Sequence, residues 1–190
     1  AWKPETDDIY PERKTPENVH LPFSSRAGSF RKIVHQRRSA VDLYGKTSIS
    51  RETFYKMLLK VMPGPGRLPF SSLPWPASVH LGLFVHRVEG ISPGLYVLVR
   101  DPGKFQDLKE SFRESFLWTR PEGCPGDLPL YLLEEGRCTD LAAQVSCYQK
   151  IAGDGAFSLG MIAEFEEPLK RYGDWFYRLL LWETGVVGQV

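Results

Sequence analysis

Hydrophobic and polar residues alternate most clearly over residues 79–86, and this pattern predicts a β-strand. Every second residue from Val79 to Val85 is Val or Leu, and successive side chains of a strand point to opposite faces. The next segment contains Gly90, Pro93 and Gly94, which is typical of a turn. The apolar residues 95–99 follow it, so we expect a second strand that pairs with the first as a hairpin.

Two helices are predicted ahead of this hairpin. The first begins near Ser29, because apolar residues recur at helical spacing from Phe30 onward, and it ends at the polar pair Arg38–Ser39. The intervening segment 42–49 contains a glycine and is predicted to be a loop. Ser50 is a favourable N-cap for the second helix. The apolar face of that helix comprises Phe54, Met57, Leu58 and Val61, and a Pro-Gly-Pro-Gly sequence ends it.

Shorter apolar patterns follow the hairpin. The spacing of the apolar residues from Phe105 to Phe116 predicts a short helix, residues 118–129 show no period, and Leu141, Val145 and Tyr148 share a helical face. Residues 156–165 are apolar and short, which we interpret as a buried strand, although the pattern alone does not exclude a helix. A long helix is predicted from about Gly173 to the end of the sequence.

These elements predict a mixed α/β (α+β) protein with helices flanking a sheet. We expect one domain over residues 26–190. The charged, proline-rich residues 1–25 resemble a linker or N-terminal arm. The last residues lie within an apolar pattern that has no stop signal, so we expect that the natural protein continues in both directions.

Composition excludes several classes of function. The 190 residues carry a formal net charge of +1, which favours neither nucleic acid nor a membrane surface as a partner. No apolar run approaches the ~20 residues of a membrane span, and the N-terminal residues do not form a signal peptide. The three cysteines have no CxxC spacing, so we expect reduced thiols in a cytoplasmic protein.

Two segments carry candidate ligand-binding chemistry. Arg37, Arg38 and Ser39 are consecutive, and two guanidinium groups with a hydroxyl can bind a phosphate, although a solvated helix end has the same sequence pattern. Trp75 lies in a proline-rich loop that could close over a planar ligand, or it could fill the core. His80 and His86 are six residues apart on a strand, about 20 Å, so they cannot share a metal, and we expect no metal site.

The segment 171–189 places polar residues at the start of an apolar helix and within it. Arg171 and Tyr172 precede the helix, while Glu183 and Gln189 lie in it. Polar groups on an apolar helix require partners, either one another or a ligand. Tyr172 can donate or relay a proton and Arg171 can anchor a substrate, but the two could equally form a surface pair.

Three motifs resemble those of the nitroreductase-like FMN oxidoreductases, specifically the SagB-type branch that includes azoline-oxidising peptide dehydrogenases. The first is Gln36–Ser39 followed by Ile49–Arg51, and the second is the hairpin Val88–Tyr96, which reads V-x-G-x-x-P-G-L-Y. The third matches at Tyr172, Gly173, Tyr177, Arg178, Glu183, Gly185 and Gln189. The resemblance covers residues 30–190. The chain departs from the family pattern where Arg171 replaces a lysine, Val186 a histidine and Val190 an asparagine. The loop Pro69–Pro76 also lacks the family's Ser-Ala-Gly core.

The resemblance implies a nitroreductase-like fold, incomplete at its C-terminus, with a mostly antiparallel central sheet. It implies FMN as the cofactor, bound by Arg37, Arg38, Ser39, Trp75 and Gln189, with Arg171 and Tyr172 at the catalytic position. The family forms dimers with flavin at the interface, and some members carry two such domains in tandem, so we expect a homodimer or an intramolecular partner domain. The implied activity is ping-pong electron or hydride transfer to a small-molecule or peptide substrate.

The departures from the family pattern leave alternatives open. One is a non-catalytic relative that acts as a dimerisation or scaffolding half, and another is a peptide-binding partner in a peptide-modification pathway. An open cleft at Arg37–Ser39 would favour the enzyme, whereas pairing of Arg37 with an internal carboxylate would favour the scaffold.

Overall fold

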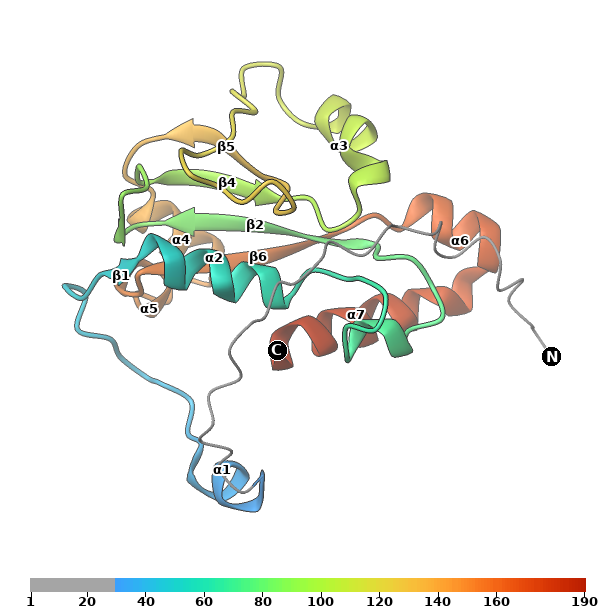
Figure 1. Cartoon of the computed structure of the whole chain (residues 1–190), viewed down its shortest axis with the longest axis horizontal. Coiled ribbons are helices and arrows are strands. Elements are labelled where there is room, and N and C mark those ends of the chain that lie inside the picture. The colour runs from blue at the N-terminus through green and yellow to red at the C-terminus, as the bar shows by residue number, and fades with distance from the viewer. Residues whose placement is uncertain (1–29) are drawn as a thin grey trace.

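The computed structural model describes residues 30–190 and has a four-stranded sheet with helices on both sides (Figure 1). The expected linker or arm at residues 1–25 and the predicted helix start at Ser29 lie outside the described residues. The strands are β1 (Ile49–Ser50), β2 (Val79–Val85), β3 (Val88–Glu89), β4 (Gly94–Leu98), β5 (Leu130–Glu135) and β6 (Phe157–Ala163). The α-helices are α1 (Phe30–Gln36), α2 (Arg51–Lys60), α3 (Phe105–Ser111), α4 (Thr139–Val145), α5 (Ile151–Asp154), α6 (Glu166–Tyr172) and α7 (Tyr177–Gln189). Three 3-10 turns, η1 (Phe70–Ser72), η2 (Pro102–Lys104) and η3 (Asp174–Phe176), complete the elements.

The main sheet has the strand order β5-β4-β2-β6, and all its pairs are antiparallel. The predicted hairpin is confirmed, because β2 pairs with β4 and Leu83 lies opposite Tyr96. β1 and β3 form a separate parallel pair. The expectation of a mixed α/β protein with a mostly antiparallel sheet flanked by helices is therefore confirmed.

The sheet buries apolar side chains on both faces. Leu81 and Leu83 of β2 belong to the largest core cluster, together with Phe54 and Leu58 of α2 and Val187 of α7. Val97 and Val99 belong to a second cluster, where aromatic residues from α3 and the segment after it pack on β5. The alternation along the hairpin thus divides its side chains between two cores.

The α2 helix begins as its sequence predicts. Ser50 lies in an extended conformation before the first turn, and its hydroxyl oxygen accepts a hydrogen bond from the Thr53 backbone N–H at 3.2 Å. The helix ends at Lys60, ahead of the Pro-Gly-rich loop. A serine N-cap satisfies one of the backbone donors that the first turn leaves unpaired.

Several predicted elements require correction. β6 is a strand but not a buried one, because it is hydrogen-bonded to β2 alone and its central residues, including Leu159 and Met161, are exposed. The α3 helix ends at Ser111, although Phe112 and Phe116 still pack in the same aromatic cluster. The predicted C-terminal helix is preceded by α6 and a break at Gly173, where φ is +88°.

Candidate functional site

The predicted phosphate-binding motif lies directly after α1, which is set apart from the sheet (Figure 1). Arg37, Arg38 and Ser39 are all exposed. Arg38 folds back onto the helix end, where its Nη1 donates to the carbonyl oxygens of His35 at 3.0 Å and of Arg37 at 2.9 Å. Within residues 30–190, neither arginine forms an ion pair with a carboxylate. The charges of Arg37 and Arg38 are therefore available to bind an anion from outside residues 30–190.

The predicted catalytic residues lie at the C-terminal end of α6. The ring of Tyr172 stacks on Phe176, with centroids 4.8 Å apart and planes inclined by 24°. The guanidinium carbon of Arg171 lies 5.3 Å from the centre of the Tyr172 ring, a cation–π distance. Both residues line a hollow of about 170 Å³ together with Pro76, Ala77, Ser78, Asp101, Lys104, Glu164, Glu167, Pro168 and Phe176.

Charged side chains compensate one another along this hollow. Lys104 Nζ lies 3.0 Å from a carboxylate oxygen of Glu164 and 3.7 Å from one of Asp107. The hydrogen bond to Glu164, reinforced by the negative charges of Glu164, Asp107 and Asp101, raises the pKa of Lys104 above its ordinary value. The lysine is thus a charged, paired group at neutral pH, and Arg171 is the other cation among the residues that line the pocket.

The size of this hollow limits its ligand. Pockets that enclose a drug-sized molecule measure about 300–1,000 Å³, and the hollow at Arg171 and Tyr172 has about 170 Å³. It accommodates a group the size of one amino-acid side chain, and a flavin ring system would not fit inside it. Any flavin at this position would therefore lie against the surface of this chain and would require further walls.

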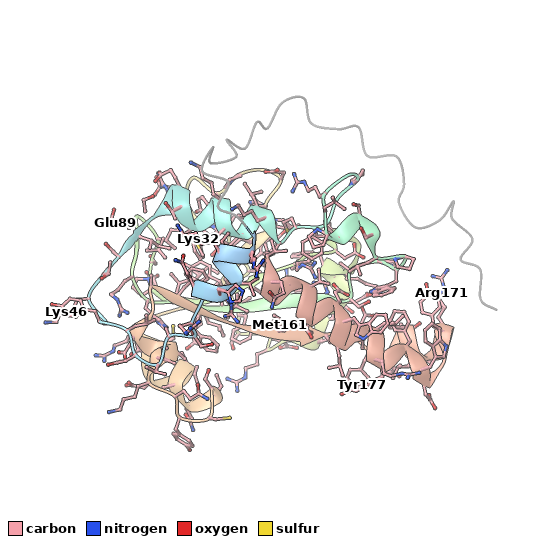
Figure 2. The ribbon with its side chains drawn as sticks, turned by 90° about the horizontal axis from the view of Figure 1, so that it is seen from below. Lys32, Lys46, Glu89, Met161, Arg171 and Tyr177 are labelled. Atoms are coloured by element: carbon pink, nitrogen blue, oxygen red, sulfur yellow. The ribbon has the colours of Figure 1, made fainter. Side chains whose placement is uncertain are left out.

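The structure does not bring the two predicted halves of the site together. In Figure 2, Lys32 of α1 and Arg171 of α6 lie far apart along the long axis of the molecule. Gln189 is exposed at the end of α7. Within a single chain, the phosphate motif and the Arg171–Tyr172 pocket are thus separate surfaces.

Trp75 is a core residue. Its side chain is 6% exposed and meets Phe176 edge-on, with centroids 6.0 Å apart, in a cluster with Leu179 and Leu180. Its indole N–H is buried without a hydrogen-bond partner among the described residues. This placement matches the core-filling role that the sequence left open, and it does not provide a stacking surface for a planar ligand.

The buried polar residue of α7 has a protein partner. Glu183 accepts a hydrogen bond from Arg100 Nη1 at 2.6 Å and further bonds from the backbone N–H groups of Ser78 at 3.0 Å and Val79 at 3.3 Å. The sequence indicates that Glu183 needs a partner but does not point to Arg100. A charged residue directly after the apolar run 95–99 was the signal for it.

No protein-family model matches the chain, and a search of curated proteins found no match. Across residues 30–190, no three His, Cys, Asp or Glu side chains are grouped to hold a metal ion, and no helix there is long and apolar enough to cross a membrane.

Proposed function

We propose that this chain is an FMN-dependent oxidoreductase of the nitroreductase-like superfamily, related to the SagB-type dehydrogenases. The supporting observation is the state of the Arg37–Arg38–Ser39 motif, which is exposed and has no carboxylate partner within residues 30–190. Two guanidinium groups and a hydroxyl match the oxygen acceptors of a phosphate monoester. The donor set therefore fits the phosphate end of FMN.

We further propose that the flavin site is completed by a second body, either another copy of the chain or a tandem domain. The phosphate motif lies away from the sheet, and the hollow at Tyr172 is too small to enclose a flavin. The exposed side of α7 also carries large apolar residues, among which Leu181 is 57% and Trp182 64% exposed. Such a surface is typical of a protein–protein interface.

Each of the candidate residues would then have a separate role. Arg37 and Arg38 would bind the phosphate, and Ser39 would donate one further hydrogen bond. The guanidinium of Arg171 would anchor an anionic group of the substrate, and Tyr172 would donate or relay a proton. FMN, when bound, supplies the electron or hydride transfer, in two half-reactions of a ping-pong cycle.

The first test is whether flavin accompanies the purified full-length protein. We expect visible absorbance of a bound flavin in the wild type and its loss in Arg37→Ala, with the same thermal unfolding midpoint. Lys32→Ala is the matched control, because it removes an exposed cation from the same helix but from outside the motif. A colourless wild type that also ignores added FMN would contradict the proposal.

A non-catalytic scaffold is the second candidate. It is favoured by the burial of Trp75 in the core and by the small volume of the Tyr172 hollow, since both restrict a flavin site within one chain. This candidate predicts self-association through α7 without flavin binding. Measuring both properties on the same preparation distinguishes the two functions.

A further inference from the structure

A larger hollow lies away from the residues of the proposed flavin site, where the chain leaves β2 and where β5 leads into α4. It has a volume of about 430 Å³ and is lined by His86, Arg87, Pro93, Glu135, Gly136, Arg137, Cys138 and Thr139. A second, smaller hollow shares Cys138 and its three preceding residues. Gly136 has φ +144°, and a Cβ there would meet nothing within 4 Å, so the space beside Gly136 is open. This volume is within the range of small-molecule sites.

Cys138 and His86 form a thiol–imidazole pair in this hollow. Sγ of Cys138 lies 3.6 Å from Nδ1 of His86, and Nε2 of His86 lies 3.0 Å from the carbonyl oxygen of Ala152. A carbonyl can only accept a hydrogen bond, so Nε2 carries the ring proton and Nδ1 is left as an acceptor facing the thiol. The thiol can also donate to the carbonyl of Gly94 at 3.3 Å.

Burial keeps both partners neutral in the resting protein. It raises the pKa of the Cys138 thiol and lowers the pKa of His86. Each side chain is only 7% exposed. The thiol therefore retains its proton until a reaction partner arrives, and the neutral imidazole is the base that is in place to take it.

The hollow has more positive than negative charge. Arg87 and Arg137 line it, with Glu135 as the one carboxylate among the lining residues. Arg87 is fixed by hydrogen bonds from Nη2 to the carbonyl oxygens of residues 153–155, while its buried Nε–H has no partner within the described part of the chain. Arg137 donates through Nε to Thr139 Oγ1 at 2.9 Å. Guanidinium groups in this arrangement favour a ligand that bears carboxylates.

We propose that this hollow is a thiol–disulfide exchange site for a low-molecular-weight disulfide that carries carboxylates. Nδ1 of His86 takes the proton from Cys138 as Sγ attacks one sulfur of the disulfide. A bond forms between Sγ of Cys138 and one sulfur of the ligand, and the disulfide bond of the ligand breaks. The departing thiolate then takes the proton from His86. Cys138 is thereby oxidised to a mixed disulfide, and one equivalent of free thiol is released. The proposal does not depend on flavin binding.

The test uses full-length protein in which Cys124 and Cys147 are replaced by serine, together with any cysteines beyond the sequence described. Oxidised glutathione is the carboxylate-bearing probe, and bis(2-hydroxyethyl) disulfide is the uncharged one. Intact-mass spectrometry under native conditions measures the rate of adduct formation. We expect one adduct per chain, faster formation with glutathione disulfide, and a rate reduced by about tenfold or more in His86→Gln, which removes the base.

Two controls keep the outcome interpretable. A chain that retains only the exposed Cys147 should show no dependence on His86. Arg137→Gln, at an exposed position, should remove the preference for the charged probe even if His86→Gln does not fold. The proposal is overturned if Cys138 reacts only after unfolding in urea, if it reacts at the same rate with and without His86, or if Arg137→Gln leaves the preference unchanged.

Discussion

At the scale of single residues, the most constrained contact is the buried ion pair between Arg100 and Glu183. Both side chains are at most 1% exposed. Arg100 also donates through Nε to the Val61 carbonyl and through Nη1 to the Val79 carbonyl, each at 2.8 Å. The pair thus connects the end of α2, the start of β2 and the middle of α7. A buried charge that loses its partner is costly, because no water replaces the lost contact.

Glu183→Gln should therefore lower the free energy of unfolding by about 3–5 kcal/mol, because it leaves the guanidinium of Arg100 buried without a counter-charge. Urea unfolding followed by tryptophan fluorescence measures the loss. Glu166→Gln is the control, since it removes an ion pair with Lys170 whose two side chains are exposed, and no measurable change is expected. Equal stability of Glu183→Gln and the wild type would refute this role.

His80 makes stability depend on pH. Burial lowers its pKa to about 4, while an unfolded histidine titrates near 6.5. Between these values the unfolded chain binds more protons, so the stability is complete above pH 6.5 and falls by about 3 kcal/mol as the pH drops through 4. Unfolding curves from pH 7 to 4 should show this fall, and His80→Asn, which can still accept from the Arg100 N–H, should flatten it. An identical slope in the variant would contradict the assignment.

At the scale of elements, local patterns predicted those segments whose structure depends on local contacts. The β2–β4 hairpin and the Ser50 cap follow from alternation and capping chemistry. β5 was not predicted, because residues 130–135 combine four apolar residues with two glutamates and show no alternation. The exposure of β6 was not predicted either, because an apolar run does not reveal which strand lies at the edge of a sheet.

Alanine substitutions at Gly173 and Gly185, compared with each other, test where the chain breaks between α6 and α7. Gly173 has φ +88° and ψ 168°, a region essentially restricted to glycine. Gly173→Ala should therefore lower the free energy of unfolding by about 1–3 kcal/mol. Gly185 lies in α7, and a Cβ there would meet nothing within 4 Å. Gly185→Ala should therefore raise the free energy of unfolding by about 0.5–1 kcal/mol. Thermal unfolding by circular dichroism measures both. Shifts of the same sign would show that the break between α6 and α7 is wrongly placed.

At the scale of the whole molecule, the sequence selects candidate site residues but does not show how the fold places them relative to one another. Arg171 and Tyr172 do line a common pocket, as neighbours at the end of one helix can. The separation of α1 from α6 (Figure 2) depends on the path that the chain takes between these two helices, which no local pattern encodes. The role of Trp75 could not be predicted for the same reason, because only tertiary packing determines whether a loop aromatic faces the core or a ligand.

The exposed side of α7 predicts self-association. Tyr177, Leu181 and Trp182 are exposed there beside the small residues Gly185 and Gly188, and Met161 of the edge strand lies next to Gly188. We expect a dimer by light scattering after size-exclusion chromatography, and we expect Leu181→Glu to shift it to a monomer. Val145→Glu is the control at an exposed apolar position of α4. A wild type that is monomeric at all concentrations would contradict this interface.

The most direct test of the proposed function is whether Arg37 recognises the phosphate of FMN. Dissociation constants for FMN and riboflavin, which differ by that phosphate, are measured by flavin fluorescence in the wild type and in Arg37→Ala. We predict that the wild type prefers FMN by about tenfold or more, as hydrogen bonds to a charged group provide, and that Arg37→Ala loses this preference while its riboflavin affinity is unchanged. Equal affinity of the wild type for the two flavins, or a preference that survives in Arg37→Ala, would contradict the account.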